Sequence, residues 1–203
     1  PYRVPADGSR MPVKLARVLA MHAAISTDGS TYAFTRGYSP WYRKHYRGSG
    51  NYDIWLYSPA DSSYNQFTAS DAPEINPMFA ANDARLYFVS ERDGTFNLYR
   101  KPLDSSAGET GEQLTRFVGD GIRRSAISAN GGTLVFSRGT DIYVMSLEGP
   151  GQPRKLDLLL PADSRGNATT WETFARDAES FTVSPDEKQA AVIVRGELFV
   201  VEN

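Results

Sequence analysis

The stretch Ile25-Ser26-Thr27-Asp28-Gly29-Ser30-Thr31-Tyr32-Ala33-Phe34 recurs three more times along the chain. The further copies, which drift in sequence, occupy residues 79–88, 127–136 and 183–192. Each copy has an apolar strand end, a polar turn and a second apolar strand, a pattern typical of two antiparallel strands. The copies start about 50 residues apart, within the range expected for one four-stranded propeller blade. The repeat therefore predicts an all-β protein with a β-propeller fold.

A second phrase follows each copy and supplies the rest of the blade. In each instance a polar residue precedes an alternating or apolar run, which predicts a third strand at 53–57, 97–101, 141–145 and 197–201. After three of these runs comes a turn and a short outer strand, at 64–68, 112–115 and 154–156. The expected unit is therefore four antiparallel strands joined by short polar turns.

The register of the repeat at the two ends of the chain predicts an incomplete ring. Residues 2–8 echo residues 99–105, so the chain opens on the third strand of a blade, and residues 11–15 would be its fourth strand. Residue 203 follows a third strand. We expect a single propeller region over 1–203, of about four to five blades: a partial blade at 1–20, whole blades at 21–68, 69–117 and 118–160, and an incomplete blade at 161–203.

Two arrangements fit this register. The N-terminal strand could complete the last blade and close a four-bladed ring, or the blades could be consecutive members of a larger, open propeller. We favour the second, because a duplicated third strand would be surplus in a closed ring. A cut propeller exposes unpaired strand edges. Another part of the polypeptide, or a second copy in a homo-oligomer, would have to cover them.

Composition is that of a soluble β domain. The 203 residues include 11 tyrosines, a residue that suits packing between blades. The net charge of −2 predicts no attraction to nucleic acid and the apolar runs are too short for membrane insertion. No cysteine is present, so no disulfide framework exists and the redox compartment stays open.

Two segments interrupt the repeat. The segment 36–50 is far longer than a hairpin needs and interleaves aromatic residues with basic ones, among them Arg43 and Arg47. Such a mixture binds anionic or stacking ligands, and it also suits contacts with another part of the same protein, which is the interpretation we favour over a ligand site or a solvated loop. The segment 156–179 is expected to cross to the next blade; within it, Asn167-Ala168-Thr169 fits the glycosylation acceptor pattern, a short match that occurs often by chance.

The pair Arg123 and Arg124 directly precedes the first strand of the third whole blade, close to a propeller's channel. Adjacent arginines at a channel mouth could bind a carboxylate through bidentate hydrogen bonds. The alternative is a solvated pair on a connecting loop. We take Arg123, Arg124, Arg43 and Arg47 as the candidate substrate-binding residues.

The sequence shows no group of residues typical of a catalytic site. His22 and His45 are the only histidines, and a lone histidine near an apolar strand is more often structural than catalytic. Asp28, Asp83 and Asp186 fall in the first turn of their repeats, where hydrogen bonds to the local backbone explain them. No phosphate loop, metal-ligand cluster or HExxH is present, so we expect no catalytic residue, no metal and no cofactor.

The repeats resemble TolB-like propellers, in which Ser-Pro-Asp-Gly turns and Asp-Ile-Tyr-Val strands recur; residues 183–186 and 141–144 are the nearest copies. More narrowly, the chain resembles the first propeller of bacterial tricorn-like serine peptidases. The resemblance lies in residues 41–48 before 53–57, in the run 89–99, and in the tail 181–186 leading into 194–200.

The resemblance implies a propeller portion of a multidomain serine peptidase, which guides or filters peptides towards a catalytic domain outside this chain. No catalytic motif of the family is found here, so no catalytic residue is carried over. The implied partners are peptides and other domains of the same polypeptide, in the periplasm, slightly favoured, or the cytoplasm of a bacterium. The alternative is a non-enzymatic TolB-like propeller that acts as a protein-binding scaffold in the cell envelope.

Overall fold

A computed structural model describes residues 1–15, 17–39, 43–149, 151–159, 173 and 175–202. The chain separates into two compact units, Pro1–Leu158 and Leu159–Asn203. The described residues form strands, turns and loops, with no helix that could cross a membrane. Each unit is treated by itself below.

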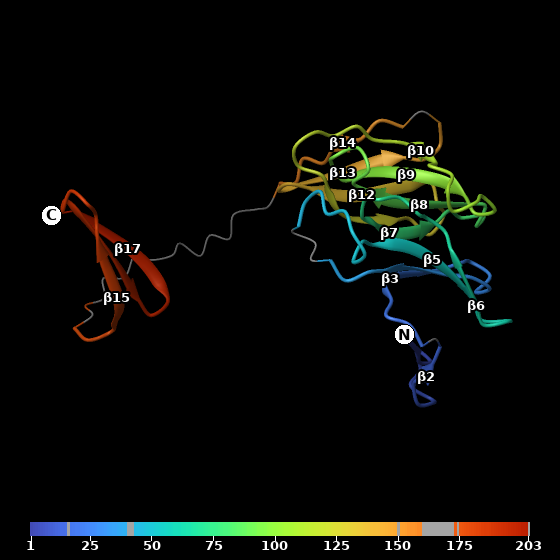
Figure 1. Ribbon diagram of the computed structural model, residues 1–203, viewed down its shortest axis with the longest axis horizontal. Helices are drawn as coiled ribbons and strands as arrows, with labels where there is room; N and C mark the ends of the chain where they lie inside the picture. Colours follow the sequence, from blue (N-terminus) through green and yellow to red (C-terminus); the bar gives the residue numbers. More distant parts are fainter. Residues whose placement is uncertain (16, 40–42, 150, 160–172, 174, 203) are drawn as a thin grey trace. The chain divides into compact units, whose positions relative to one another are not determined.

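Three four-stranded antiparallel sheets make up most of the first unit (Figure 1). Blade 1 holds β3 (Met21–Ile25), β4 (Tyr32–Arg36), β5 (Asp53–Ser58) and β6 (Ser63–Gln66). Blade 2 holds β7 (Glu74–Phe79), β8 (Arg85–Ser90), β9 (Asn97–Pro102) and β10 (Glu112–Gln113). Blade 3 holds β11 (Ile122–Ile127), β12 (Thr133–Arg138), β13 (Asp141–Ser146) and β14 (Arg154–Lys155). In each blade the strands lie in chain order, as the repeat predicts.

The two remaining sheets are smaller. In the first unit β1 (Tyr2–Arg3) pairs with β2 (Val13–Lys14), and the Tyr57 hydroxyl on blade 1 donates a 3.0 Å hydrogen bond to the Leu15 carbonyl. The second unit is a three-stranded antiparallel sheet of β15 (Ala178–Val183), β16 (Gln189–Val194) and β17 (Glu197–Glu202). The prediction of an all-β propeller fold built of four-stranded antiparallel blades is confirmed. The assignment of 1–203 to one propeller region, with its blade boundaries, stays a prediction.

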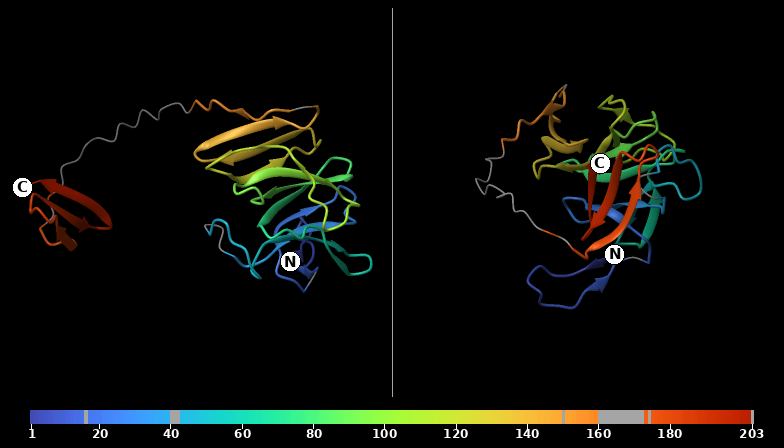
Figure 2. Two further views of the ribbon diagram at one scale, coloured as in Figure 1. Left: turned by 45° about the horizontal axis from the view of Figure 1, so that its top comes forward. Right: turned by 90° about the vertical axis from the view of Figure 1, so that its left-hand side faces the viewer.

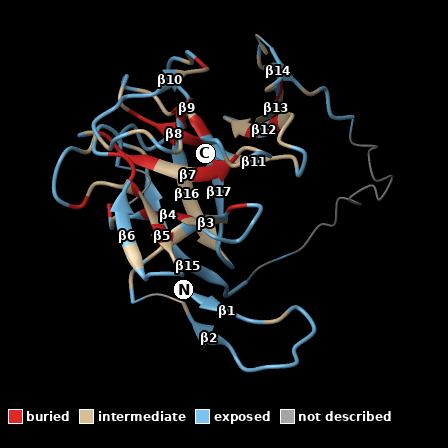
Figure 3. Cartoon of the chain, turned by 90° about the vertical axis from the view of Figure 1, so that its right-hand side faces the viewer, coloured by how far each residue is buried: buried red, intermediate tan, exposed pale blue. Residues whose placement is uncertain are grey.

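The core lies between blades, because each strand alternates apolar side chains to both faces of its sheet. The left panel of Figure 2 shows the three sheets of the first unit stacked as successive layers. Ala33 and Ile54 of blade 1 pack with Leu86 and Phe88 of blade 2. On the other face of blade 2, a second cluster joins that blade to blade 3: Met78, Tyr87, Val89, Leu98, Ile122, Leu134, Phe136 and Met145. Blade 2 is therefore covered on both faces, and the burial colouring of Figure 3 shows this on β7, β8 and β9.

The first turn of each repeat owes its shape to one polar side chain. In blade 1, Asp28 accepts hydrogen bonds from the Ser26 hydroxyl at 2.7 Å and the Ser30 amide at 2.9 Å. These bonds hold the pKa of Asp28 down at about 2. The same position is Asn82, Asn130 and Asp186 in the later copies, and each accepts a bond from the amide two residues ahead. The recurrence of Asp and Asn in the repeat thus has a local backbone cause.

Asp83 is the exception, and its predicted role in the local turn is wrong. It occupies the next turn position, where the backbone is left-handed, with φ 53°. Blades 1 and 3 have glycine there, Gly29 and Gly131. The Asp83 carboxylate instead reaches blade 1, where it accepts hydrogen bonds from the Thr27 amide at 2.8 Å and the Thr27 hydroxyl at 3.2 Å. It therefore links two blades.

The contribution of this link can be measured with Asp83→Gly, which inserts the residue that the other two blades use. Glycine removes the carboxylate and adopts the left-handed backbone readily, so the bonds to Thr27 are lost without new strain in the turn. We expect the free energy of unfolding to fall by about 1 kcal/mol in urea denaturation, the usual net value of such bonds. Asp61→Ala, which removes an exposed carboxylate bonded only within its own turn, should cost less; equal losses would contradict the interblade role.

Candidate functional site

The first strands of the three blades, β3, β7 and β11, together line a pocket of about 370 Å³. Each of these strands contains a shift of register against its neighbour. In β3 and β7 the irregularity includes a residue in the left-handed conformation, His22 with φ 48° and Asn76 with φ 62°. Bulges of this kind redirect side chains and are common near functional sites. Here they place His22 and Asn76 in the pocket wall.

The wall combines small apolar residues with polar ones in about equal measure. Ala23, Ala24 and Ala80 contribute methyl groups, while Met78 and Ile127 add larger surfaces. Its polar groups are partly engaged with one another: the Asn76 side-chain nitrogen donates to the Ser125 hydroxyl at 2.9 Å and to the Ser125 carbonyl at 3.3 Å. That contact also ties blade 2 to blade 3.

Arg123 and Arg124 lie within β11, so the prediction that they directly precede the first strand of this blade is wrong. The shift of register falls between Ile122 and Arg124, with Arg123 inside it. Both arginines are exposed, and within the described residues neither takes part in an ion pair or hydrogen bond. The sequence failed to show the strand here because two charged residues interrupt its apolar pattern.

His22 and Arg124 come from different blades yet influence each other. The pKa of His22 is lowered, chiefly because the surrounding protein displaces water from the ring and secondly because of the positive charge of Arg124. Although His22 is exposed overall, both effects favour the neutral form of its imidazole. A cationic guanidinium thus lies near a pocket of mixed polar and apolar surface, an arrangement that suits a ligand with an anionic group.

Arg43 and Arg47 do not join this site. They lie on the loop between β4 and β5, are exposed, and are not in the wall of the pocket. The Arg43 guanidinium stacks 4.5 Å from the centre of the Tyr46 ring, a cation–π contact. Residues 40–42 of this loop lie outside the described residues, as does the Asn167-Ala168-Thr169 acceptor pattern.

The same loop contacts blade 2, so it does touch another part of the protein. The His45 amide donates a 2.9 Å hydrogen bond to the Glu91 carboxylate, and the His45 ring nitrogen Nδ1 lies 3.8 Å from it. Glu91 is buried in the turn after β8. His45, with φ 57°, therefore has a structural contact. Whether the loop also binds a ligand stays a prediction.

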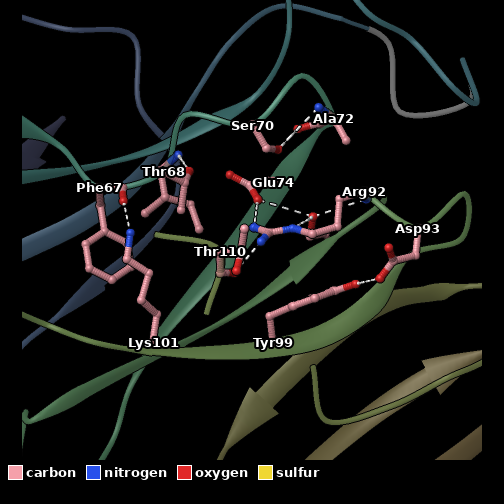
Figure 4. Close-up of polar contacts among 12 residues, drawn as sticks. Phe67, Thr68, Ser70, Ala72, Glu74, Arg92, Asp93, Tyr99, Lys101 and Thr110 are labelled. Carbon is pink, nitrogen blue, oxygen red and sulfur yellow. Dashed lines mark hydrogen bonds and ion pairs between the residues drawn. The ribbon is translucent and has the colours of Figure 1, made fainter. Parts of the chain in front are cut away.

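A buried polar network supports blade 2 and its junction with blade 1 (Figure 4). Glu74, at the start of β7, is fully buried and forms an ion pair with Arg92. The Ser90 hydroxyl donates to Glu74 at 3.2 Å, and the Arg92 side chain donates to Ser90 at 3.0 Å. Arg92 also donates to the Thr110 carbonyl and stacks 4.6 Å from the centre of the Tyr99 ring. Sequence reasoning missed this network, since its members carry no repeat or spacing signal.

Two further charges surround Glu74. The Lys101 ammonium donates to the carbonyls of Phe67 at 2.6 Å and Ser106 at 2.7 Å, and burial lowers its pKa. Burial and the negative charge of Glu74 raise the pKa of Asp53 to about 6, against the opposing effect of Arg36. No group of three His, Asp or Glu side chains in the described ranges could hold a metal ion. Through Glu74 the network includes the start of β7, one of the three pocket strands.

The pocket and its strands can be compared with known proteins. The Tricorn protease N-terminal beta propeller domain family matches residues 1–150. A tricorn protease homolog of Saccharolobus solfataricus is 28% identical over 158 residues, which cover 78% of this chain and 14% of the relative. A putative tricorn protease homolog 2 of Streptomyces coelicolor is 26% identical over 159 residues, 77% of this chain and 12% of that relative. The chain thus spans about one seventh of these relatives or less.

Solved structures show the same fold. A crystal structure of the tricorn protease aligns with 99% of this chain and 18% of its own, at a TM-score of 0.65 and 22% identity. TolB from Acinetobacter baumannii aligns with 97% of this chain and 44% of its own, at a TM-score of 0.54 and 17% identity. Because the family match covers 150 of the 203 residues, the chain belongs to the Tricorn protease N-terminal beta propeller domain family.

Proposed function

We propose that this chain is the propeller portion of a larger serine peptidase and that it guides or filters peptides towards a catalytic domain outside the chain. Family membership supports the link to a protease, and the tricorn relatives are several times longer than the chain. The other domains of the polypeptide are then its permanent partners and peptides its transient ones. A homo-oligomer would be a further way to cover the strand edges.

The observation that carries the proposal is the position of Arg123 and Arg124 on β11, one of the three strands that line the pocket. The two side chains are exposed on β11, and Arg124 lies close enough to the pocket residue His22 to affect its pKa. An arginine that has no carboxylate partner among the described residues can bind one from a ligand, through two parallel N–H···O bonds. A peptide ends in such a carboxylate. We therefore assign the pair to capture of the C-terminal end of a peptide.

A double variant tests this role. Arg123→Ala/Arg124→Ala should weaken binding of peptides with a free C-terminal carboxylate by about tenfold to a hundredfold, because a hydrogen bond to a charged group contributes ~1.5–3 kcal/mol. The matching C-terminal amides, which lack the charge, should bind equally to both proteins. Isothermal titration calorimetry with one peptide in both forms measures the difference.

The control variant removes two other exposed arginines, Arg10 and Arg154. Arg10→Ala/Arg154→Ala changes the net charge by the same amount, so it should leave the preference for the acid form intact if the site is local. An equal loss of affinity for acid and amide in the Arg123/Arg124 variant, or the same loss in the control, would contradict the proposal. The TolB-like scaffold function has no observation of its own, because the likeness to TolB shows only the fold.

A further inference from the structure

We propose that the loop between β4 and β5 selects peptides with acidic side chains, through a cationic patch formed by Arg43, Lys44 and Arg47. This inference rests on the proposed function, since it names the class of peptide that the propeller would guide. It concerns side chains along the peptide, whereas the arginine pair on β11 is assigned to the carboxylate at the end of the peptide.

The patch carries three positive charges without a negative charge beside them. Residues 36–50 contain no aspartate or glutamate. All three patch residues are exposed, and in the part of the chain that the structure describes none of them forms an ion pair. The positive charge of the patch is therefore available to a ligand.

Neighbouring contacts order the backbone of the patch before any ligand binds. The Arg43 guanidinium stacks 4.5 Å from the centre of the Tyr46 ring, and the Tyr46 hydroxyl accepts a 3.2 Å hydrogen bond from the Gly50 amide. Between Arg43 and Tyr46, the His45 amide donates to the buried Glu91 carboxylate of blade 2 at 2.9 Å. A site that is already ordered loses less conformational entropy when it binds a ligand.

The loop lies at the end of the blades where the pocket strands begin. It leaves β4 next to Thr35, which pairs with Met21 at the start of β3. It contacts blade 2 at Glu91, directly after Ser90, which pairs with Glu74 at the start of β7. Both strands continue into the lining of the pocket. A peptide that approaches the pocket from this end therefore passes the loop.

Carboxylates fit the patch better than uncharged groups do. A guanidinium donates two parallel hydrogen bonds to a carboxylate, and an ammonium adds an attraction that depends less on direction. Each exposed ion pair contributes little, so selection requires several acidic side chains on one peptide. Nucleic acid is also anionic, but the net charge of −2 on the chain does not attract it. The patch is therefore suited to an acidic peptide.

The test uses the full 203-residue chain and peptides with an acetylated N-terminus and an amidated C-terminus. The peptides differ only at alternating positions, whose side chains share one side of an extended chain, and carry glutamate, glutamine or lysine there. Fluorescence anisotropy should show that the glutamate peptide binds about threefold to tenfold more tightly than the glutamine peptide. The lysine peptide should bind most weakly, because like charges repel. At about 1 M salt, where the Debye length is about 3 Å, the differences should disappear.

Lys44→Gln/Arg47→Gln tests whether the patch causes the preference. Arg43 is kept, because its contact with Tyr46 helps to order the loop. The variant should bind the glutamate and glutamine peptides within about twofold of each other, because it loses two of the three charges. The matched control removes one lysine and one arginine that are exposed elsewhere, in Arg10→Gln/Lys188→Gln. The control should keep the preference for glutamate, and circular dichroism checks that both variants fold.

The outcomes separate this inference from the proposed function. Equal binding of the glutamate and glutamine peptides by the unmodified chain would overturn the patch inference. It would leave the proposed function standing, because the blocked peptides have no terminal carboxylate. A preference for glutamate that survives in the patch variant, or that the control loses equally, would overturn the patch inference as well. So would a short single-stranded oligonucleotide that binds more tightly than the glutamate peptide, since nucleic acid would then be the ligand.

Discussion

Glu74→Ala lowers the free energy of unfolding by about 3–5 kcal/mol, the usual cost of removing one partner of a buried ion pair. Glu74 is fully buried, and its carboxylate accepts from both Arg92 and the Ser90 hydroxyl. Without it, the Arg92 guanidinium loses its ionic partner, and the nearby Lys101 loses a stabilising negative charge. Arg92 and Lys101 then keep their bonds to uncharged oxygens but lose the nearest buried negative charge.

The measurement is urea denaturation followed by far-UV circular dichroism. Glu112→Ala is the matched control, because it also removes a glutamate from an ion pair with arginine, Arg100, on the same blade. That pair is partly exposed, so its loss should cost at most about 1 kcal/mol. If the Glu74 variant is too unstable to purify, Glu74→Gln, which keeps one acceptor oxygen for Ser90, gives the measurement. Similar losses for the positions 74 and 112 would contradict the structural role of the network.

Phe88→Ala should reduce stability by about 3–5 kcal/mol, since it leaves a cavity as well as losing buried apolar surface. Phe88 is fully buried in β8. Its ring stacks on Tyr99 at a centroid distance of 5.9 Å and meets the edge of Phe67 at 6.5 Å. Phe67 follows the outer strand of blade 1, so the cavity would open in the junction between blades 1 and 2.

Chemical denaturation of the Phe88 variant should therefore show a large shift of the midpoint. Tyr38→Ala is a suitable control: it truncates an aromatic side chain that is 69% exposed. Its effect should stay within about 0.5 kcal/mol, as for most surface substitutions. A Phe88 variant as stable as the Tyr38 variant would mean that blades 1 and 2 do not pack as described.

The strands could be predicted from the sequence because their signals are local. The run 53–57 has a polar residue before four apolar or aromatic ones, and β5 indeed spans Asp53–Ser58. Asp28 could be assigned to its turn because its partners are two residues away. Such features depend only on residues that are close together in the chain. The four copies of the repeat show the same signals again, which strengthens each prediction.

The site depends on contacts that the repeat does not contain. Asp83 bonds to Thr27, 56 residues earlier, and Asn76 bonds to Ser125, 49 residues later. The left-handed backbone at His22 is set by a shift of strand register, which has no residue signature there. The charge of the arginine pair and its position in the repeat made it a candidate site from the sequence. Its place inside β11, and the proximity of Arg124 to His22, became visible only in the fold.

The central claim is that the first strands of three blades bind the C-terminal end of a peptide. Its most direct test is a nuclear magnetic resonance titration of the isotope-labelled chain. Addition of a peptide acid ending in leucine should shift the backbone amide signals of His22, Asn76 and Ser125, which come from β3, β7 and β11. The matching amide should leave them nearly unchanged. Shifts confined to the outer strands β6, β10 and β14, or equal shifts with acid and amide, would contradict the account.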